Sequence, residues 1–255
     1  MLSLAIPPPP PELVELIGGV MESGSFHARH LIRDAGLLPE HRILDVGCGI
    51  GRTAIPLTEY LSQRGDYQGF DVSAESIHWC RTEISSRYPN FNFTHVDVAN
   101  AAYNQAGVVS PTDFRFPYPD AHFDVACLFS IFTHLCPPEL EHYLSEIART
   151  LKEGGRVMAS FFVLTDERLA GARSLVEANP EMRELKALVD GRHGDYYSPF
   201  DPPEWGVAYE ESIVRATFER NGLQVKEPIR FGNWSDWTQD GPAFAGTQDT
   251  VLAQR

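Results

Sequence analysis

Short apolar runs alternate with segments of helical spacing along the middle of the chain. The runs that we expect to form strands are Arg42–Val46, Tyr67–Phe70, Phe91–Val96, Phe123–Phe129 and Arg156–Val163. Helical spacing lies between them, over Thr53–Arg64, from Ser73 to about Arg87, and over Pro138–Leu151. Strands that alternate with helices are typical of a parallel sheet with helices on both faces. The pattern therefore predicts an α/β fold.

The flanking segments do not follow this alternation. A polyproline stretch, Pro7–Pro11, precedes two expected helices, Leu13–Val20 and Phe26–Ala35, the second ending at Gly36. After Val163 we expect one helix, a loop rich in Gly, Tyr and Pro, a helix over Tyr209–Asn221, and strands at Leu223–Ile229 and Thr250–Ala253. We therefore predict an N-terminal helical segment (1–36) that forms part of a substrate wall. The domain itself is expected over 37–255, with an inserted cap at about 164–205. That insertion is either a lid that excludes water from the substrate or a surface loop with aromatic anchors.

Charge and composition narrow the class of protein. The 255 residues include 35 acidic and 21 basic ones, giving a formal net charge of −14. Such a chain is a poor binder of nucleic-acid phosphates, which require a Lys/Arg surface. No apolar run approaches the ~20 residues that span a bilayer, and the N-terminus does not resemble a signal peptide. The four cysteines lack zinc-like spacing, so we expect reduced thiols and a cytoplasmic protein without nucleic-acid or membrane partners, either a monomer or a homodimer.

The segment Ile43–Arg52 (ILDVGCGIGR) carries the main chemical signal. An apolar strand ends at Asp45-Val46, three glycines follow with GxGxG spacing, and a helix begins. A dinucleotide site prefers GxGxxG, and a P-loop ends in GK[ST]. Asp45 would repel a pyrophosphate but suits a ligand with an ammonium group, such as the amino-acid end of S-adenosylmethionine.

Two more carboxylates end the next two predicted strands. Asp71 lies in GFDVS and Asp97 in THVDVAN. Ends of parallel strands converge on one crevice, where Asp71 can accept hydrogen bonds from ribose hydroxyls and Asp97 can meet the exocyclic amine of an adenine. Each aspartate alone is typical of a turn or a helix cap. Together with the glycine loop, they indicate a site for one nucleoside with a charged tail.

The ordered motifs resemble those of the class I S-adenosylmethionine-dependent methyltransferases. ILDVGCGIGR, GFDVS and HVDVAN resemble the first three motifs, FDVACLFSIFTHL (Phe123–Leu135) the fourth, and LKEGGRVMASFF (Leu151–Phe162) the fifth. The resemblance covers roughly residues 25–255. It implies a Rossmann-like seven-stranded sheet in the order 3-2-1-4-5-7-6, with the last strand antiparallel. It also implies glycines under the cofactor, Asp71 at the ribose, Asp97 with Val98 at the adenine, and a backbone contact from Phe129. The residues that we expect to contact the cofactor are Asp45, Gly47, Cys48, Gly49, Gly51, Arg52, Asp71, Val72, Asp97, Val98, Phe129 and Ser130.

Three segments are similar to an uncharacterised bacterial subset of small-molecule methyltransferases: Pro89–Gly107, Phe129–Leu135 and Thr247–Arg255. That subset carries a Tyr-Asn-Pro-x-Gly segment, and Tyr103–Gly107 here reads Tyr-Asn-Gln-Ala-Gly, without the proline. A related group of quinone O-methyltransferases binds a divalent metal after the fourth strand. At the corresponding positions this chain has Ser130 and Thr133, which are not hard anionic ligands, so we expect no metal.

His134 is the candidate catalytic residue, because the fourth strand ends where the transferred methyl group must emerge. Three roles stay open for it: a general base, a pocket residue that orients the substrate, and a packing residue at a helix start. We expect an enzyme that methylates O or N of a small molecule. The alternatives are a non-methylating S-adenosylmethionine-binding protein of the same fold, and a nucleic-acid or protein methyltransferase. Ser130-Ile131-Phe132 and the negative charge disfavour the last of these.

Overall fold

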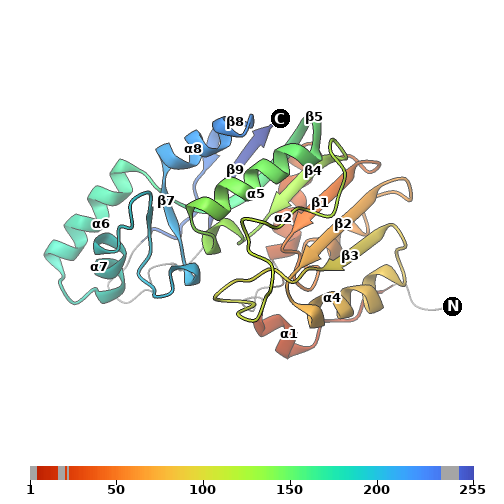
Figure 1. Cartoon of the computed structure of the whole chain (residues 1–255), viewed down its shortest axis with the longest axis horizontal. Coiled ribbons are helices and arrows are strands. Elements are labelled where there is room, and N and C mark those ends of the chain that lie inside the picture. Colours follow the sequence, from red (N-terminus) through yellow and green to blue (C-terminus); the bar gives the residue numbers. More distant parts are fainter. Residues whose placement is uncertain (1–4, 17–20, 22, 237–246) are drawn as a thin grey trace.

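The computed structural model describes residues 5–16, 21, 23–236 and 247–255. Its centre is a twisted sheet with helices on both faces (Figure 1). The strands of the main sheet are β1 (Arg42–Val46), β2 (Asp66–Asp71), β3 (Phe91–His95), β4 (Phe123–Leu128), β5 (Leu151–Leu164), β8 (Gln224–Arg230) and β9 (Asp249–Gln254). They lie in the order β3-β2-β1-β4-β5-β9-β8.

Strand direction confirms the predicted topology. β1 to β5 are parallel neighbours, and β9 runs antiparallel between β5 and β8. With β8 as the sixth strand and β9 as the seventh, the order is the expected 3-2-1-4-5-7-6. Two short strands were not predicted: β6 (Tyr196–Tyr197) and β7 (Ala208–Glu210), which extend the sheet beside Phe162–Leu164 at the end of β5.

The helices are α1 (Pro11–Leu16), α2 (Ser23–Arg33), α3 (Ala54–Leu57), α4 (Ala74–Cys80), α5 (Pro137–Thr150), α6 (Asp166–Ala178), α7 (Arg183–Asp190) and α8 (Glu211–Arg220). They follow the predicted alternation, except that the helix after the glycine loop is shorter than expected and the cap holds two helices, α6 and α7, rather than one. Part of the expected first helix, 17–20, lies outside the described residues. The helix expected over Thr53–Arg64 is much shorter in the structure: α3 ends at Leu57, and turns follow it through Tyr60. Gly24 of α2 packs directly on the Arg52 carbonyl.

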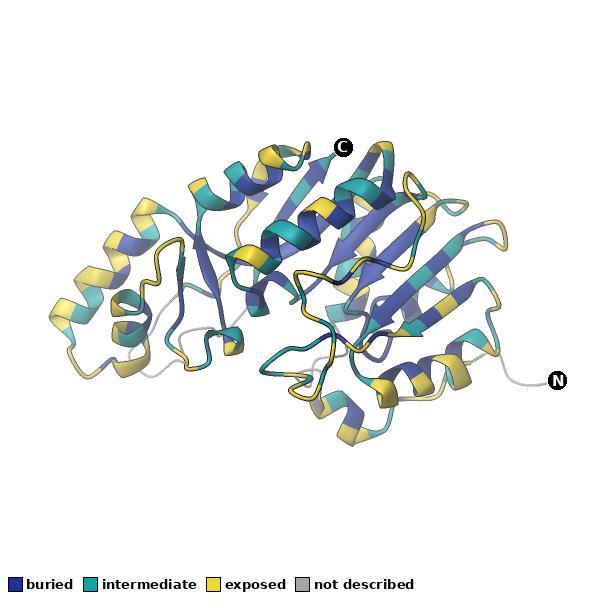
Figure 2. Ribbon diagram, in the orientation of Figure 1, coloured by how far each residue is buried: buried dark blue, intermediate teal, exposed yellow. Residues whose placement is uncertain are grey.

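The pleat of the central strands divides their side chains between two apolar layers. Ile43 of β1 faces α2, α3 and α4, whereas Leu44 faces α5 and α8. β4 alternates in the same way, with Val125 and Cys127 toward the first layer and Ala126 toward the second. Figure 2 shows these strands as the most buried part of the molecule.

The segment predicted as a cap contains α6, α7, β6 and a short 3₁₀ turn, η3 (Pro203–Trp205). It forms one end of the molecule, on the left in Figure 1. A third apolar cluster joins it to the end of β5 and includes Leu169, Leu185, Tyr197 and Trp234. The cap is thus packed on the sheet through its own small core.

Candidate functional site

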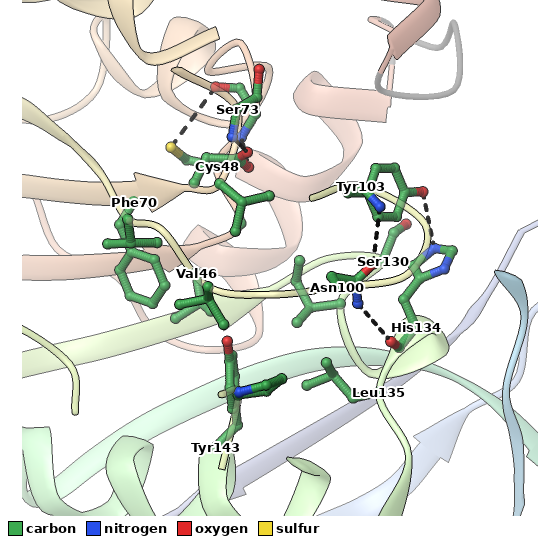
Figure 3. Close-up of a pocket in the computed structure, with 18 of the residues that line it drawn as sticks. Val46, Cys48, Phe70, Ser73, Asn100, Tyr103, Ser130, His134, Leu135 and Tyr143 are labelled. Atoms are coloured by element: carbon green, nitrogen blue, oxygen red, sulfur yellow. Dashed lines mark hydrogen bonds between the residues drawn. The ribbon is translucent and has the colours of Figure 1, made fainter. Parts of the chain in front are cut away.

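A crevice lies at the carboxyl ends of β1, β2 and β4, the edge at which open α/β sheets bind ligands (Figure 3). The predicted residues that line it are Gly47, Cys48, Gly49, Arg52, Asp71, Val72, Val98, Phe129, Ser130 and His134. Asp45, Gly51 and Asp97 do not line it. The residues of its wall that sequence reasoning had not assigned to the site include Phe70, Asn100, Tyr103, Leu135 and Tyr143.

The glycine loop follows β1 in a conformation that side chains disfavour. Gly47, Gly49 and Gly51 have φ angles of +71°, +53° and +72°. A Cβ atom on Gly47 would lie 2.0 Å from Ile131 Cδ1, and one on Gly51 would lie 2.7 Å from Ile84 Cδ1. The loop therefore requires these glycines for backbone geometry and close packing, and Gly51 serves the fold beneath the crevice.

The N–H groups of this loop are already bonded within the fold. Those of Gly47 and Cys48 donate to the Phe70 carbonyl at 2.9 and 3.0 Å, and that of Gly51 donates to the Cys48 carbonyl at 2.9 Å. The N–H of Gly49 donates to Asp71 Oδ2 at 2.8 Å. A phosphate cradle needs such donors directed at the ligand. This loop presents a carboxylate instead, which disfavours a dinucleotide.

Asp71 is anchored at the end of β2 by two loops. Besides the bond from Gly49, its Oδ1 accepts the N–H of Ser73 at 2.8 Å. Burial raises the pKa of Asp71, and these N–H donors act against that rise by stabilising the carboxylate. Each oxygen keeps a second lone pair, so the carboxylate can still accept a pair of hydroxyl groups.

Asp45 lies beneath the crevice rather than in its wall. Its carboxylate is 3% exposed and accepts hydrogen bonds from the Tyr67 hydroxyl and, at 3.4 Å, from Cys127 Sγ. Burial raises the pKa of Asp45 to about 6, although the two hydrogen bonds and nearby Arg52 oppose the shift. Any effect of Asp45 on a ligand must therefore be exerted through its charge.

Asp97 is exposed at the rim, where its Oδ1 accepts the Asn104 amide at 3.2 Å. The wall next to it is formed by Val96, Val98 and Asn100, and the opposite side by Leu135 and Tyr143. This end of the crevice is therefore mainly apolar, as a flat heterocycle requires.

The residues after β4 form the other end. Phe129 stacks on His27 of α2 with ring centroids 3.8 Å apart. Burial and the neighbouring Arg52 lower the pKa of His27 to about 3, so that ring is neutral. Ser130 has φ +61°, a strained value for a residue with a side chain, and its N–H donates to Ser160 Oγ at 2.7 Å.

His134 is held between two segments that are distant in sequence. Its Nδ1 lies 2.8 Å from the Glu204 carbonyl oxygen of η3, and its Nε2 lies 3.3 Å from the Tyr103 hydroxyl. Burial lowers the pKa of His134, so the imidazole is neutral near pH 7. Sequence reasoning missed Tyr103 as a site residue, although the Tyr-Asn-x-x-Gly segment was a visible signal.

Residues 43–155 match the family model described as a methyltransferase domain. This segment, which is less than half of the chain, resembles a methyltransferase domain. The chain is similar to a sterol 24-C-methyltransferase from Yarrowia lipolytica, with 27% identity over 62% of this chain and 35% of that protein. It is also similar to a tRNA N(3)-cytidine methyltransferase from Gallus gallus, with 28% identity over 48% of this chain and 30% of that protein. The matched segments thus span about a third of the length of these two relatives.

A solved S-adenosylmethionine-dependent methyltransferase from Aquifex aeolicus shares the fold of this chain. The two superpose with a TM-score of 0.55 at 17% identity, over 97% of this chain and 99% of the other. The match over residues 43–155 agrees with the predicted class of protein, and the cofactor of that class is S-adenosylmethionine.

The crevice of this chain fits that cofactor. A nucleoside with a cationic amino-acid tail needs a hydroxyl acceptor, an apolar slot and negative charge, rather than phosphate donors. Asp71, the slot beside Val98 and Leu135, and the buried Asp45 match these needs. Within the described ranges, no group of three or more His, Cys, Asp or Glu residues is placed to hold a metal ion. No helix in the described part of the chain is long and apolar enough to cross a membrane.

Proposed function

We propose that this protein is an enzyme that transfers a methyl group from S-adenosylmethionine to an oxygen or nitrogen atom of a small molecule. The observation that carries the proposal is the commitment of the glycine-loop N–H groups to the fold, with Asp71 accepting one of them. That arrangement disfavours a phosphate and favours a nucleoside with a positive charge. The bound cofactor supplies an electrophilic methyl group on its sulfonium.

The crevice residues have separate tasks in this proposal. Asp71 accepts the ribose hydroxyls, and Val72, Val98 and Leu135 enclose the adenine. Gly47 and Gly49 let the cofactor lie against the backbone, and Asp45 attracts its ammonium group from below. Phe129 and Ser130 border the methionine moiety. Arg52 and Cys48 complete the wall, and Asp97 stays a candidate for the adenine amine if the rim closes over the cofactor.

His134 is the proposed proton acceptor for the methyl acceptor. Its ring is neutral and lines the crevice beside Phe129 and Ser130. Alignment of the two reactants can supply most of the rate acceleration of a methyl transfer, and a base adds to it when the acceptor carries a proton.

The small-molecule acceptor is supported by the surroundings of the crevice. The cap reaches it through the contact between Glu204 and His134, and the N–H of Val207 donates to the Thr133 carbonyl at 2.8 Å. A site bordered by a packed cap and by α2 suits a compact acceptor. The net charge of −14 is unfavourable for a polyanionic one, although one relative acts on tRNA. A gel-shift with tRNA at low salt tests that alternative.

Isothermal titration with S-adenosylmethionine and S-adenosylhomocysteine tests the proposal. Both should bind, and Asp71→Ala should weaken binding at least tenfold because the ribose loses its acceptor. Asp190→Ala, on an exposed face of α7 with 61% side-chain exposure, is the control and should bind as the wild type does. An absence of binding at millimolar cofactor contradicts the proposal. Formation of S-adenosylhomocysteine in acceptor panels separates an enzyme from a non-methylating binder.

A further inference from the structure

Residues 99–109 form a well-anchored loop at the rim of the crevice, called the Tyr103 loop below. Its ends pair where the Ala99 N–H donates to the Val109 carbonyl at 2.8 Å, and its middle closes through reciprocal backbone bonds between Asn100 and Asn104 at 3.0 and 2.9 Å. A Cβ atom on Gly107 would lie 2.5 Å from the Ala99 nitrogen. The loop therefore has a fixed path that only a glycine at 107 permits.

The Tyr103 loop is joined to His134 at three points (Figure 3). Asn100 Nδ2 donates to the His134 carbonyl at 3.3 Å, and the Tyr103 hydroxyl lies 3.3 Å from His134 Nε2. The two rings meet edge to face, with centroids 5.0 Å apart. Tyr103 also lines the crevice and is 49% exposed, so it is accessible to a ligand.

The hydrogen bonds around His134 can run in only one direction. The Glu204 carbonyl can only accept, so His134 Nδ1 carries the proton of the neutral ring. His134 Nε2 then has a lone pair, and the Tyr103 hydroxyl donates to it. The Tyr103 oxygen keeps its own lone pairs, and because Tyr103 lines the crevice, it can accept a proton from a ligand there.

The groups around Tyr103 and His134 favour a protonated phenol and a neutral imidazole. Burial raises the pKa of Tyr103, so the phenol keeps its proton at rest, although Arg52 acts in the opposite direction. Glu139 and Cys136 at the start of α5 also lie close to Glu204, and burial raises the pKa of both. The neighbouring groups on α5 are therefore less acidic than usual, and the neutral imidazole is the natural acceptor.

We propose that Tyr103 is a second catalytic residue, acting with His134 as a proton relay for a weakly acidic hydroxyl acceptor. This inference rests on the proposed function. The acceptor O–H bond breaks and its proton goes to Tyr103 Oη, while the Tyr103 proton goes to His134 Nε2. The acceptor oxygen forms its bond to the methyl carbon as the carbon–sulfur bond breaks. The positive charge lost from sulfur appears on the imidazolium, so charge and atoms balance. The substrate class is thus an alcohol or phenol that must lose a proton.

Nitrogen-15 NMR of histidine-labelled protein saturated with S-adenosylhomocysteine tests the relay. The His134 signal, assigned by its loss in His134→Gln, should show a neutral ring protonated at Nδ1 near pH 7. Tyr103→Phe should keep this tautomer but shift the Nε2 resonance and raise the pKa of His134, because a donor to its lone pair is lost. Tyr60→Phe is the control: Tyr60 donates to the Leu37 carbonyl elsewhere, so the His134 signal should not move.

Three outcomes overturn the relay. They are a His134 ring protonated at Nε2, a charged ring at pH 7, and an unchanged Nε2 resonance in Tyr103→Phe. Titration of S-adenosylhomocysteine separates the two proposals. If the wild type does not bind it, the proposed function fails as well. If the wild type binds S-adenosylhomocysteine and the affinity of Tyr103→Phe is within about threefold of it, the NMR result alone decides on the relay. A loss of affinity of more than tenfold in Tyr103→Phe would make Tyr103 a cofactor-binding residue and overturn the relay.

Discussion

Two residues at or beneath the crevice are in energetically unfavourable states. Asp45 keeps a carboxylate in the core, where ionisation is costly, and Ser130 holds a backbone angle that favours glycine. Unfavourable local states that persist in a packed structure concentrate at functional sites. Ser130 lines the part of the crevice proposed for the methionine moiety and Asp45 lies beneath the crevice, which supports that proposal.

Replacing Asp45 by Asn should stabilise the protein at neutral pH and weaken its cofactor binding. The pKa of Asp45 is raised from 3.8 to about 6, so the folded state binds the proton more tightly than the unfolded state does. The free energy of unfolding of the wild type therefore falls as pH rises from about 4 to about 6, by about 3 kcal/mol for two pKa units. Asparagine does not titrate and can still accept from Tyr67.

Urea unfolding at pH 4 and pH 7.5 measures this difference. The gap between Asp45→Asn and the wild type should grow by about 2–3 kcal/mol in favour of the variant between the two pH values. Asp190→Asn, an exposed aspartate on α7, should show no such growth. A gap that is the same at both pH values would mean that Asp45 titrates normally in the folded protein.

At the scale of elements, α2 packs against α3, the helix that follows the glycine loop. The contact passes through Gly24, whose added Cβ would lie 1.9 Å from the Arg52 carbonyl oxygen. α2 also supplies His27, whose ring stacks on that of Phe129. Any displacement of α2 should therefore reach the crevice from two directions.

Gly24→Ala should push α2 away from α3 and lower the affinity for S-adenosylhomocysteine at least tenfold. Backbone contacts do not yield as a side chain would, and so the thermal midpoint should fall as well. Gly171→Ala in α6 is a matched control, because nothing lies within 4 Å of its added Cβ. Alanine there should be neutral or should stabilise by about 0.5–1 kcal/mol, since it favours helix. Calorimetry measures both quantities, and equal behaviour of the two variants would show that the Gly24 contact is not tight.

The elements that sequence predicts well are those whose burial is periodic. β1 was predicted to the residue, and the predicted ends of β2, β3 and β4 were wrong by one residue at most, because a central strand is an apolar run between polar ends. The helix after the glycine loop was predicted too long, since the helical spacing of apolar residues continues through the turns after Leu57. β6 and β7 were missed because strands of 2 and 3 residues are too short to show an alternating pattern.

The site residues likewise differ in how well the sequence predicts their positions. The glycine loop and Asp71 were predictable, since strand ends must meet at one sheet edge. The contacts of His134 with Tyr103 and Glu204 were not, because they depend on the paths of two irregular loops. The burial of Asp45 away from the crevice was also hidden, as it depends on the hydroxyl of Tyr67 on the next strand.

At the scale of the whole molecule, one buried carboxylate joins the sheet to the cap. Asp249, at the start of β9, accepts the N–H groups of Val163 and Gly232 at 2.7 and 2.8 Å. It also accepts from the Arg168 guanidinium at 2.8 Å and from Trp234 Nε1 at 2.6 Å. Four separate segments therefore meet at a single fully buried side chain.

Asp249→Ala should lower the free energy of unfolding by about 3–5 kcal/mol, because it leaves the partly buried Arg168 guanidinium and several N–H donors without their acceptor. Asp236→Ala is the control: it changes an exposed aspartate that precedes β9 in the sequence. It should lower the free energy of unfolding by less than about 0.5 kcal/mol. Urea unfolding of the two variants gives both values. A loss below about 1 kcal/mol for Asp249→Ala would show that the four segments are held together by their apolar contacts instead.

The insertion of β9 between β5 and β8 also has a consequence for biosynthesis. β5 ends at Leu164, whereas the strand that covers its far edge begins only at Asp249. While the ribosome makes the residues between them, the nascent chain carries an open strand with apolar side chains such as Val157 and Phe161. Unpaired edges of this kind recruit other strands. Translational pausing in that interval should therefore favour aggregation or chaperone capture, and the sheet should close only after β9 has left the exit tunnel.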